Sequence, residues 1–311
     1  MSLIEQAAKR LEQLRQAGVE LPEEPAAPAH KARAAATAPD PYETPVIKPT
    51  ATVGEAPKTA AAVSKRVELN LEAISASGLL VPQATRSQLA DEYRVIKRPL
   101  IANAMGKGSE PLANGNLIMV TSALPGEGKS FTAINLAISI AMELDNTVML
   151  VDADVARPSV LNMLGLPPAP GLLDVVDKNS VDISGVLLRT NIEKLSILPS
   201  GTQHPRATEL LASDAMVRLL DDMSSRYNDR IIIFDSPPLL LTTESRALAT
   251  HMGQIVIVVN AENTAQAAVK QAVDAIAECP VKMMVLNQAR QASTDGYGYG
   301  YGYGYGYGNE K

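Results

Sequence analysis

Residues 121–130 read TSALPGEGKS and join an apolar stretch at 117–121 to a segment with helical periodicity. The glycines at 126 and 128 let backbone N–H groups turn toward an anion, and the start of the helix adds a partial positive charge. Lys129 is placed to reach the β- and γ-phosphates of a nucleotide, and the Ser130 hydroxyl is placed to bind Mg²⁺. The spacing therefore predicts a phosphate-binding loop of the P-loop type.

One position departs from the strict GxxxxGK[ST] pattern, because Ala123 stands where the first glycine is usual. The Gly-x-Gly-Lys-Ser core is complete and lies between a predicted strand and a predicted helix, which is the context that the motif requires. A chance glycine-rich turn is the alternative interpretation. The two acidic motifs that follow along the chain disfavour it.

Carboxylates end two further apolar segments. Asp152 and Asp154 follow VMLV at 148–151, and Asp235 follows IIIF at 231–234. Because the carboxyl ends of parallel strands meet at one edge of a sheet, we expect these side chains beside the phosphate loop. Mg²⁺ takes oxygen ligands and keeps several waters, so Asp235 suits a residue that holds a metal-bound water, and Asp152 and Asp154 add a second acidic point. For Asp154, a helix cap and a site role stay equally open.

The elements that must position these residues alternate along the chain. Apolar strands are predicted at 117–121, 147–151, 195–199, 230–235, 254–259 and 281–287. Helices are predicted at 87–105, 129–143, 207–226 and 264–277. Short apolar strands that alternate with helices indicate an α/β fold, with a mostly parallel sheet covered by helices on both faces. We therefore expect a P-loop NTPase domain over residues 86–290.

The segments outside this domain differ in composition. Residues 1–20 contain an amphipathic stripe, which predicts an N-terminal helix over 3–15 that either packs on its own domain or docks elsewhere. Residues 21–85 are rich in proline and alanine, with eight prolines between 22 and 57, and we expect a largely disordered linker there. Residues 291–311 are a low-complexity tail of alternating tyrosine and glycine.

Composition excludes several classes of function. The formal net charge of −6 gives no basic footprint for nucleic acid. The single cysteine, Cys279, precludes an intrachain disulfide and fits a reducing cytosol. The three histidines are far apart and lack metal-ligand spacing. Since no apolar run approaches the ~20 residues of a membrane span, we expect no direct membrane span, and another chain would have to bring this one to a membrane.

Three motifs together resemble the bacterial tyrosine kinases (BY-kinases) of exopolysaccharide synthesis, and the chain looks most similar to the stand-alone autokinases of exosortase loci. The motifs are the phosphate loop at 122–130, the Asp-x-Asp at 152–154 and the Asp-x-Pro at 235–237. Related partition and septum-positioning ATPases carry a signature lysine where Leu124 stands here. A leucine cannot neutralise phosphate charge, so a nucleotide-switched ATPase of that branch is the disfavoured alternative.

Two positions depart from the kinase pattern. The arginine expected at residue 156 is replaced by Ala156, and Arg157 follows it. The oligomerisation motif ExxRxxR reads Asp91, Arg94 and Lys97, which keeps the charges but not the geometry of the arginine fork. The resemblance implies assembly into a ring through these three residues. The alternative interpretation of 91–98 is a solvated helix face.

The resemblance also assigns roles around the site. It implies catalytic roles for Lys129, Asp152, Asp154 and Asp235, with Asp152 as the candidate proton acceptor. It implies Mg²⁺ ligation through Ser130, Asp152 and Asp235. It implies ATP binding by Pro125, Gly126, Glu127, Gly128, Lys129, Ser130, Phe131 and Asn287, of which Asn287 would contact the adenine.

Six of the nine tyrosines lie in the tail, which resembles the family's autophosphorylation cluster. They are Tyr297, Tyr299, Tyr301, Tyr303, Tyr305 and Tyr307. Glycine at every second position keeps the backbone mobile, so each phenol can enter a narrow cleft. The alternative interpretation of the tail is an adhesive segment without an enzymatic role. For the whole chain, a non-enzymatic ATP-binding scaffold is a further alternative function.

The family also implies partners and a location. We expect a homo-oligomeric ring, a membrane chain-length-determinant (polysaccharide co-polymerase) protein as activator, and a protein tyrosine phosphatase. We expect a cytoplasmic protein that a partner recruits to the inner face of the inner membrane. The implied activity is that of a non-specific protein-tyrosine kinase that regulates exopolysaccharide polymerisation and export.

Overall fold

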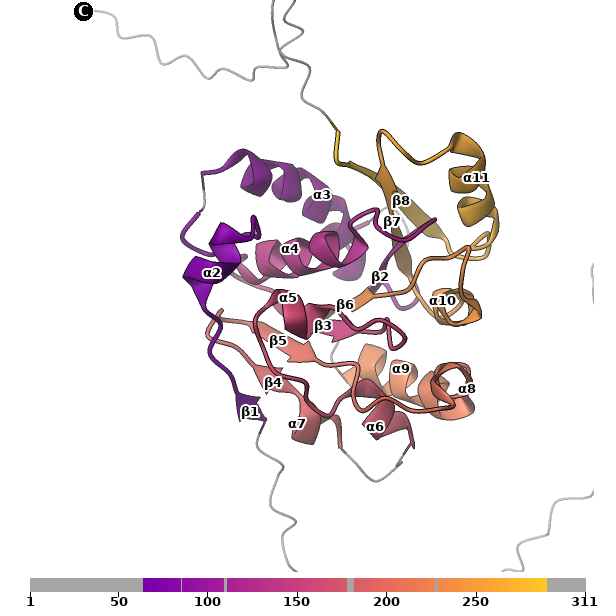
Figure 1. The fold of residues 1–311 in the computed structure, drawn as a ribbon, viewed down its shortest axis with the longest axis horizontal. Helices are drawn as coiled ribbons and strands as arrows, with labels where there is room; N and C mark the ends of the chain where they lie inside the picture. The colour runs from indigo at the N-terminus through magenta and orange to yellow at the C-terminus, as the bar shows by residue number, and fades with distance from the viewer. Residues whose placement is uncertain (1–63, 85, 109–110, 178–181, 227–228, 290–311) are drawn as a thin grey trace, which may run out of the picture. The chain divides into compact units, whose positions relative to one another are not determined.

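The computed structural model describes residues 64–84, 86–108, 111–177, 182–226 and 229–289 (Figure 1). The helix predicted within 1–20, the linker up to residue 63 and the tyrosine-rich tail lie outside the described residues. In the ranges that the structure describes, no helix combines the length and the apolar character needed to cross a membrane.

An eight-stranded sheet forms the centre of the described part of the chain, in the order β1-β4-β5-β3-β6-β2-β7-β8. Neighbouring strands are parallel except β4 and β5, which are antiparallel. The strands are β1 (Lys65–Arg66), β2 (Leu117–Ser122), β3 (Thr147–Asp152), β4 (Leu188–Arg189), β5 (Leu195–Leu198), β6 (Arg230–Asp235), β7 (Gln254–Asn260) and β8 (Val281–Asn287). The predicted α/β fold with a mostly parallel sheet is confirmed.

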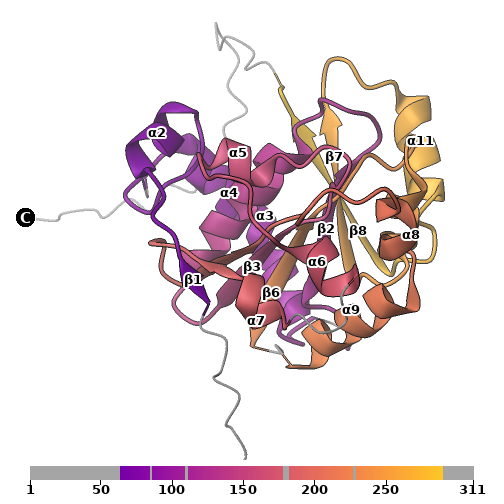
Figure 2. The same ribbon diagram turned by 60° about the horizontal axis from the view of Figure 1, so that its bottom comes forward.

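Helices cover both faces of the sheet, as Figures 1 and 2 show. One face carries α2 (Leu71–Ala76), α3 (Gln88–Ala104), α4 (Lys129–Ala141) and α5 (Val160–Met163). The other carries α6 (Leu172–Asp177), α7 (Ile183–Val186), α8 (Ala207–Leu211), α9 (Asp214–Arg226), α10 (Thr243–Ala249) and α11 (Gln266–Asp274).

The central strands are apolar along their whole length because both of their faces are covered. In β2, Leu117 and Met119 pack into the core on the side of α9, whereas Ile118 and Val120 pack on the side of α4. Side chains alternate between the faces of a strand, so a strand buried on both faces shows a continuous apolar run. This burial places the polar residues that follow β2, β3 and β6 at one edge of the sheet.

Residues 64–84 belong to the fold, so the boundary predicted at residue 85 is wrong. β1 pairs with β4, and the side chains of Leu69, Ile74 and 79–81 are buried in the core beside α4. The backbone N–H of Leu80 donates to Oδ1 of Asn135 on α4, over 2.7 Å. Elements this short depend on tertiary contacts, which periodicity along the sequence does not reveal.

The helix predicted over 207–226 is two helices, α8 and α9. The hydroxyl of Ser213 lies between them, donates to the carbonyl of Leu210 and accepts from the N–H of Met216. A serine that bonds its own backbone competes with helix continuation. The short helices α5, α6, α7 and α10 and the strand β4 were not predicted, because they are too short to show a clear period.

Candidate active site

The loop between β2 and α4 has the backbone geometry of an anion-binding turn. Gly126 and Gly128 have φ values of 82° and 92°, in the left-handed region that side chains disfavour. A Cβ at Gly128 would lie 2.1 Å from Nδ2 of Asn287, so this position also has no room for a side chain. The loop leads into the N-terminus of α4, where unpaired backbone N–H groups attract phosphate.

Glu127 braces the loop from behind. Its buried carboxylate accepts from the N–H of Leu124 at 2.6 Å and from the hydroxyl of Thr264. The N–H of Asn260, at the end of β7, lies 3.4 Å from the same carboxylate. The Glu127 side chain therefore stabilises the loop itself, and the predicted contact of Glu127 with the nucleotide stays a prediction.

Asn287 braces the loop from the end of β8. Its Nδ2 donates to the carbonyl of Glu127 over 2.9 Å, and Nε2 of Gln288 donates to the carbonyl of Gly126 over 3.2 Å. The predicted contact of Asn287 with an adenine stays a prediction. The bracing contacts of Glu127 and Asn287 join residues 137 and 160 positions apart, and no local motif signals them.

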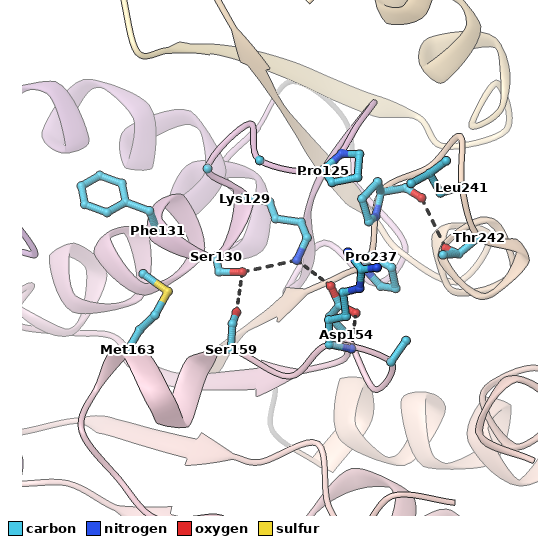
Figure 3. Close-up of a pocket in the computed structure, with 15 residues that line it drawn as sticks. Pro125, Lys129, Ser130, Phe131, Asp154, Ser159, Met163, Pro237, Leu241 and Thr242 are labelled. Atoms are coloured by element: carbon cyan, nitrogen blue, oxygen red, sulfur yellow. Dashed lines mark hydrogen bonds and ion pairs between the residues drawn. The ribbon is translucent and has the colours of Figure 1, made fainter. Parts of the chain in front are cut away.

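Lys129 lies at the centre of the site (Figure 3). Its Nζ is 2.7 Å from Oδ2 of Asp154, 3.7 Å from Oδ1 of Asp235 and 3.3 Å from Oγ of Ser130. Burial alone would lower the pKa of Lys129, but the carboxylates of Asp235 and Asp154 outweigh it and raise the pKa above its ordinary value. The structure thus brings together residues from three separate motifs, as predicted from the sequence.

Asp152 and Asp235 are paired neighbours in the register of β3 and β6, and both are buried. Burial, with the negative charge of Asp235, raises the pKa of Asp152 to about 7. Burial likewise raises the pKa of Asp235 to about 6. Oδ2 of Asp152 accepts from the N–H groups of Ser159 and Val160, both at 3.1 Å. Its Oδ1 and both oxygens of Asp235 have no hydrogen-bond partner among the described residues.

These oxygens without hydrogen bonds fit a divalent cation. Lys129 supplies one positive charge, 3.7 Å from Oδ1 of Asp235, against the carboxyl groups of Asp152, Asp154 and Asp235, and Mg²⁺ prefers such hard oxygen ligands. Oγ of Ser130 lies beside them and accepts a hydrogen bond from the hydroxyl of Ser159 over 2.8 Å. Ser130 and Asp235 would hold the cation, and Asp152 would compensate its charge from the neighbouring strand.

A cavity of about 570 Å³ opens in front of Lys129, Ser130 and Asp154, a size typical of small-molecule sites. Asp235 lies beneath its surface, and Asp152 lines a neighbouring cavity with Pro158 and Leu161. The walls of the first cavity come from the phosphate loop, from the segment after β3 and from the segment after β6. The lining residues are Pro125, Gly126, Gly128, Lys129, Ser130, Phe131, Asp154, Ala156, Arg157, Ser159, Met163, Pro237, Pro238, Leu241 and Thr242. Sequence reasoning did not single out Met163, Pro238, Leu241 or Thr242, since they carry no motif.

The three residues predicted for oligomerisation do not share one surface. Asp91 and Arg94 form an exposed ion pair on α3. Lys97 is buried, with its Nζ 2.6 Å from a carboxylate oxygen of Glu143 and 2.5 Å from the carbonyl of Ser139. The prediction that Lys97 contributes to an assembly surface is therefore wrong, because the side chain turns inward and ties α3 to α4.

Fold and site together define a nucleotide-binding P-loop protein of the α/β class. Residues 115–288 match the family model of an AAA domain. The chain is 34% identical over 167 residues to the tyrosine-protein kinase YwqD of Bacillus subtilis, covering 54% of this chain and 69% of that protein.

Two further comparisons agree with this class. The chain is 32% identical over 183 residues to the succinoglycan biosynthesis transport protein ExoP of Rhizobium meliloti, covering 58% of this chain but only 22% of that protein. The solved VpsO kinase domain superposes with a TM-score of 0.54 at 25% identity, covering 71% of this chain and 97% of that domain. The chain belongs to the family of bacterial tyrosine-protein kinases.

Proposed function

We propose that this chain is an ATP- and Mg²⁺-dependent protein-tyrosine autokinase whose acceptors are the six tyrosines between residues 297 and 307. The observation that carries this proposal is the position of the end of β8. Asn287, its last residue, touches the phosphate loop through the carbonyl of Glu127. The chain therefore continues toward its tyrosine cluster from the edge of the site itself.

The distance from the fold to the acceptors suits transfer to the same or a neighbouring subunit. Ten residues separate Asn287 from Tyr297, and an extended chain of that length spans about 33 Å. Glycine between successive tyrosines removes side chains that would block entry of a phenol into a cleft.

The reaction transfers the γ-phosphoryl group of ATP. The phenolic oxygen forms a bond to the γ-phosphorus, the bond from that phosphorus to the β–γ bridging oxygen breaks, and ADP leaves. The phenolic proton passes to a base, for which Asp152 is our candidate and the γ-phosphate the alternative. Such transfer depends mainly on positioning and charge neutralisation.

Different residues of this chain would supply the positioning and the charge neutralisation. The loop 125–130 holds the phosphates with its backbone, and Lys129 neutralises charge on the β- and γ-phosphates. Mg²⁺, when bound by Ser130 and Asp235, supplies further charge neutralisation on the phosphate oxygens. Asp154 holds Nζ of Lys129 in place, over 2.7 Å.

The cellular role that we propose is regulation of exopolysaccharide polymerisation and export, supported by the likeness to a succinoglycan biosynthesis transport protein. A membrane chain-length-determinant protein recruits the kinase to the inner face of the inner membrane and activates it. A tyrosine phosphatase reverses the modification. Subunits assemble into a ring through the exposed face of α3 that carries Asp91 and Arg94.

Staining of the purified full-length chain with an anti-phosphotyrosine antibody tests the proposed activity. We expect a signal that appears with ATP and Mg²⁺, disappears with a chelator and maps to peptides from residues 297–307. ATP hydrolysis without phosphotyrosine would contradict the proposal and favour a nucleotide-switched ATPase.

A further inference from the structure

The cavity in front of the phosphate loop has two ends, and the phosphate-binding residues fix their order. A P-loop serine binds the metal ion and its lysine reaches the β- and γ-phosphates. Nζ of Lys129 points away from α4 toward Asp154 and Asp235. Figure 3 shows Phe131 and Met163 on one side of Lys129, and Leu241 and Thr242 on the other. The terminal phosphate therefore faces the side of Leu241, which is the acceptor end.

The acceptor end is lined with apolar side chains, which offer phosphate neither a hydrogen-bond donor nor a positive charge. Pro237, Pro238 and Leu241 follow β6 and line the cavity. Figure 3 shows Pro125 of the phosphate loop on the same side of Lys129 as Pro237 and Leu241. Phosphate groups are bound by N–H donors and cations, so three prolines and a leucine at this end indicate that an apolar group lies beside the terminal phosphate.

The loop that carries Leu241 is firmly anchored. The side chain of Leu239 is fully buried, and its N–H donates to the carbonyl of Ser122 over 2.9 Å. The hydroxyl of Thr121 donates to the carbonyl of Pro237 over 2.8 Å, and that of Thr242 lies 2.9 Å from Oγ of Ser245. The loop thus presents Leu241 to the cavity from a rigid base.

Leu241 is exposed at that position. Its exposed fraction is 61%. Five large apolar residues of the described chain are exposed to about this extent or more, and of these Leu241 lines the cavity. The others are Val95, Leu144, Met284 and Leu286. Exposed apolar surface at the mouth of a site is typical of a binding contact.

We propose that Leu241, with Pro125, Pro237 and Pro238, binds the aromatic ring of the tyrosine that accepts the phosphoryl group. This inference rests on the proposed kinase function and adds the residues that select its acceptor. The apolar mouth holds the ring, and the length of the phenol carries its hydroxyl inward to the γ-phosphorus. A serine or threonine hydroxyl attached at the same backbone position stops short of it and leaves the apolar mouth uncovered.

The test uses the full-length chain with all six tail tyrosines changed to alanine, so that no tail ring competes for the apolar mouth, and a synthetic peptide with the sequence of residues 295–308 as acceptor. We expect Leu241→Ser to raise the KM for the peptide about tenfold and to leave the Kd for ATP·Mg²⁺ within about twofold. Leu241→Met keeps an apolar side chain, so we expect it to retain most of the acceptor affinity. Leu144→Ser is the matched control, because Leu144 is exposed and does not line the cavity.

Two results would overturn the inference. An unchanged KM for the peptide in Leu241→Ser would show that the leucine does not contact the acceptor. A loss of ATP affinity equal to the loss of peptide affinity would assign the apolar mouth to the nucleotide. Failure of the parent protein to phosphorylate the peptide at all, together with no phosphotyrosine in the wild-type chain, would instead contradict the proposed function.

Discussion

Lys129 is the residue on which the proposed chemistry depends most directly. We expect Lys129→Met to reduce phosphotyrosine formation to below about a tenth of the wild-type rate, a change of ~1.4 kcal/mol or more in the barrier. The ammonium group would no longer neutralise the phosphates, and Asp154 and Asp235 would lose their cation. Lys270→Met, on the exposed surface of α11, is the control. Activity above a tenth in Lys129→Met would contradict the role assigned to this lysine.

Alanine substitutions at Gly126 and Gly128 distinguish the effect of backbone strain from the effect of a steric clash. Alanine at either position is strained, by roughly 1–2 kcal/mol, because both have positive φ. At Gly126 the new Cβ meets nothing within 4 Å, but at Gly128 it lies 2.1 Å from Nδ2 of Asn287.

We therefore expect Gly128→Ala to weaken nucleotide binding more than Gly126→Ala, as measured by titration with a fluorescent nucleotide. Adding Asn287→Ala to Gly128→Ala should restore part of the affinity. Equal losses in the two single variants would mean that the contact with Asn287 does not matter.

Sequence motifs located Lys129, Ser130, Asp154 and Asp235 at the site because those residues are fixed by short patterns at strand ends. The roles of Glu127 and Leu241 could not be predicted in the same way. The direction of the Glu127 side chain depends on Thr264 and Asn260, which are distant in sequence. Leu241 is one of three consecutive leucines, and only the folded loop shows which of them is exposed.

At the scale of the elements, the contact between α3 and α4 contains a buried lysine where the sequence predicted an exposed one. We expect Lys97→Ala to lower the free energy of unfolding by about 1–3 kcal/mol, because it removes a charged hydrogen bond to the carbonyl of Ser139 and an ion pair with Glu143. Arg94→Ala should change stability by no more than ~0.5–1 kcal/mol, since its ion pair with Asp91 is exposed. Chemical denaturation of both variants distinguishes them, and equal effects would contradict the structure at Lys97.

The segment 64–84 gives a second prediction at this scale. A chain that begins at residue 86, the boundary suggested by composition, would uncover the core residues against which Leu69, Ile74 and Leu80 pack. We expect this truncation to lower the Tm and to promote aggregation, whereas a chain that begins at residue 64 should retain the Tm of the full-length protein. Equal Tm values for the two truncations would show that the segment contributes nothing to stability.

The helices and strands that were predicted correctly are long or continuously apolar, as in α4 and β7. Lys97 shows why the rest was harder to predict. A lysine in a charged helix segment suggests a solvated face, yet its long side chain reaches the carboxylate of Glu143, just beyond the C-terminus of α4. Such pairing depends on how two helices are packed, and one helix alone does not indicate it.

At the scale of the whole molecule, phosphorylation of the tail would more than double the net negative charge of the chain. Each phosphate adds about −1.5 to −2, so six add roughly −9 to −12, against a formal net charge of −6 for the entire chain. Tails gathered near acidic sites would repel one another. We therefore propose that unphosphorylated subunits form the ring and that phosphorylation opens it.

Light scattering before and after addition of ATP and Mg²⁺ measures this change. We expect the mass of the wild-type assembly to fall on phosphorylation, and the mass of a variant with all six tail tyrosines changed to phenylalanine to stay constant. Single Tyr→Phe changes should have little effect, because the six positions share the same glycine setting. The same mass for both proteins in both conditions would rule out this mechanism.

The attachment of Asn287 to the phosphate loop also sets the order in which the protein matures during synthesis. The loop at 123–128 leaves the ribosome long before β8, and its braces at residues 260, 264 and 287 follow only later. Pairings between segments so far apart in the chain form slowly compared with local contacts. A nascent chain thus acquires a fully braced phosphate site only after every other strand of the sheet has been made. The tyrosines that we propose as acceptors follow Asn287 directly in the chain, so the braced site and these tyrosines are completed in the same last stretch of synthesis.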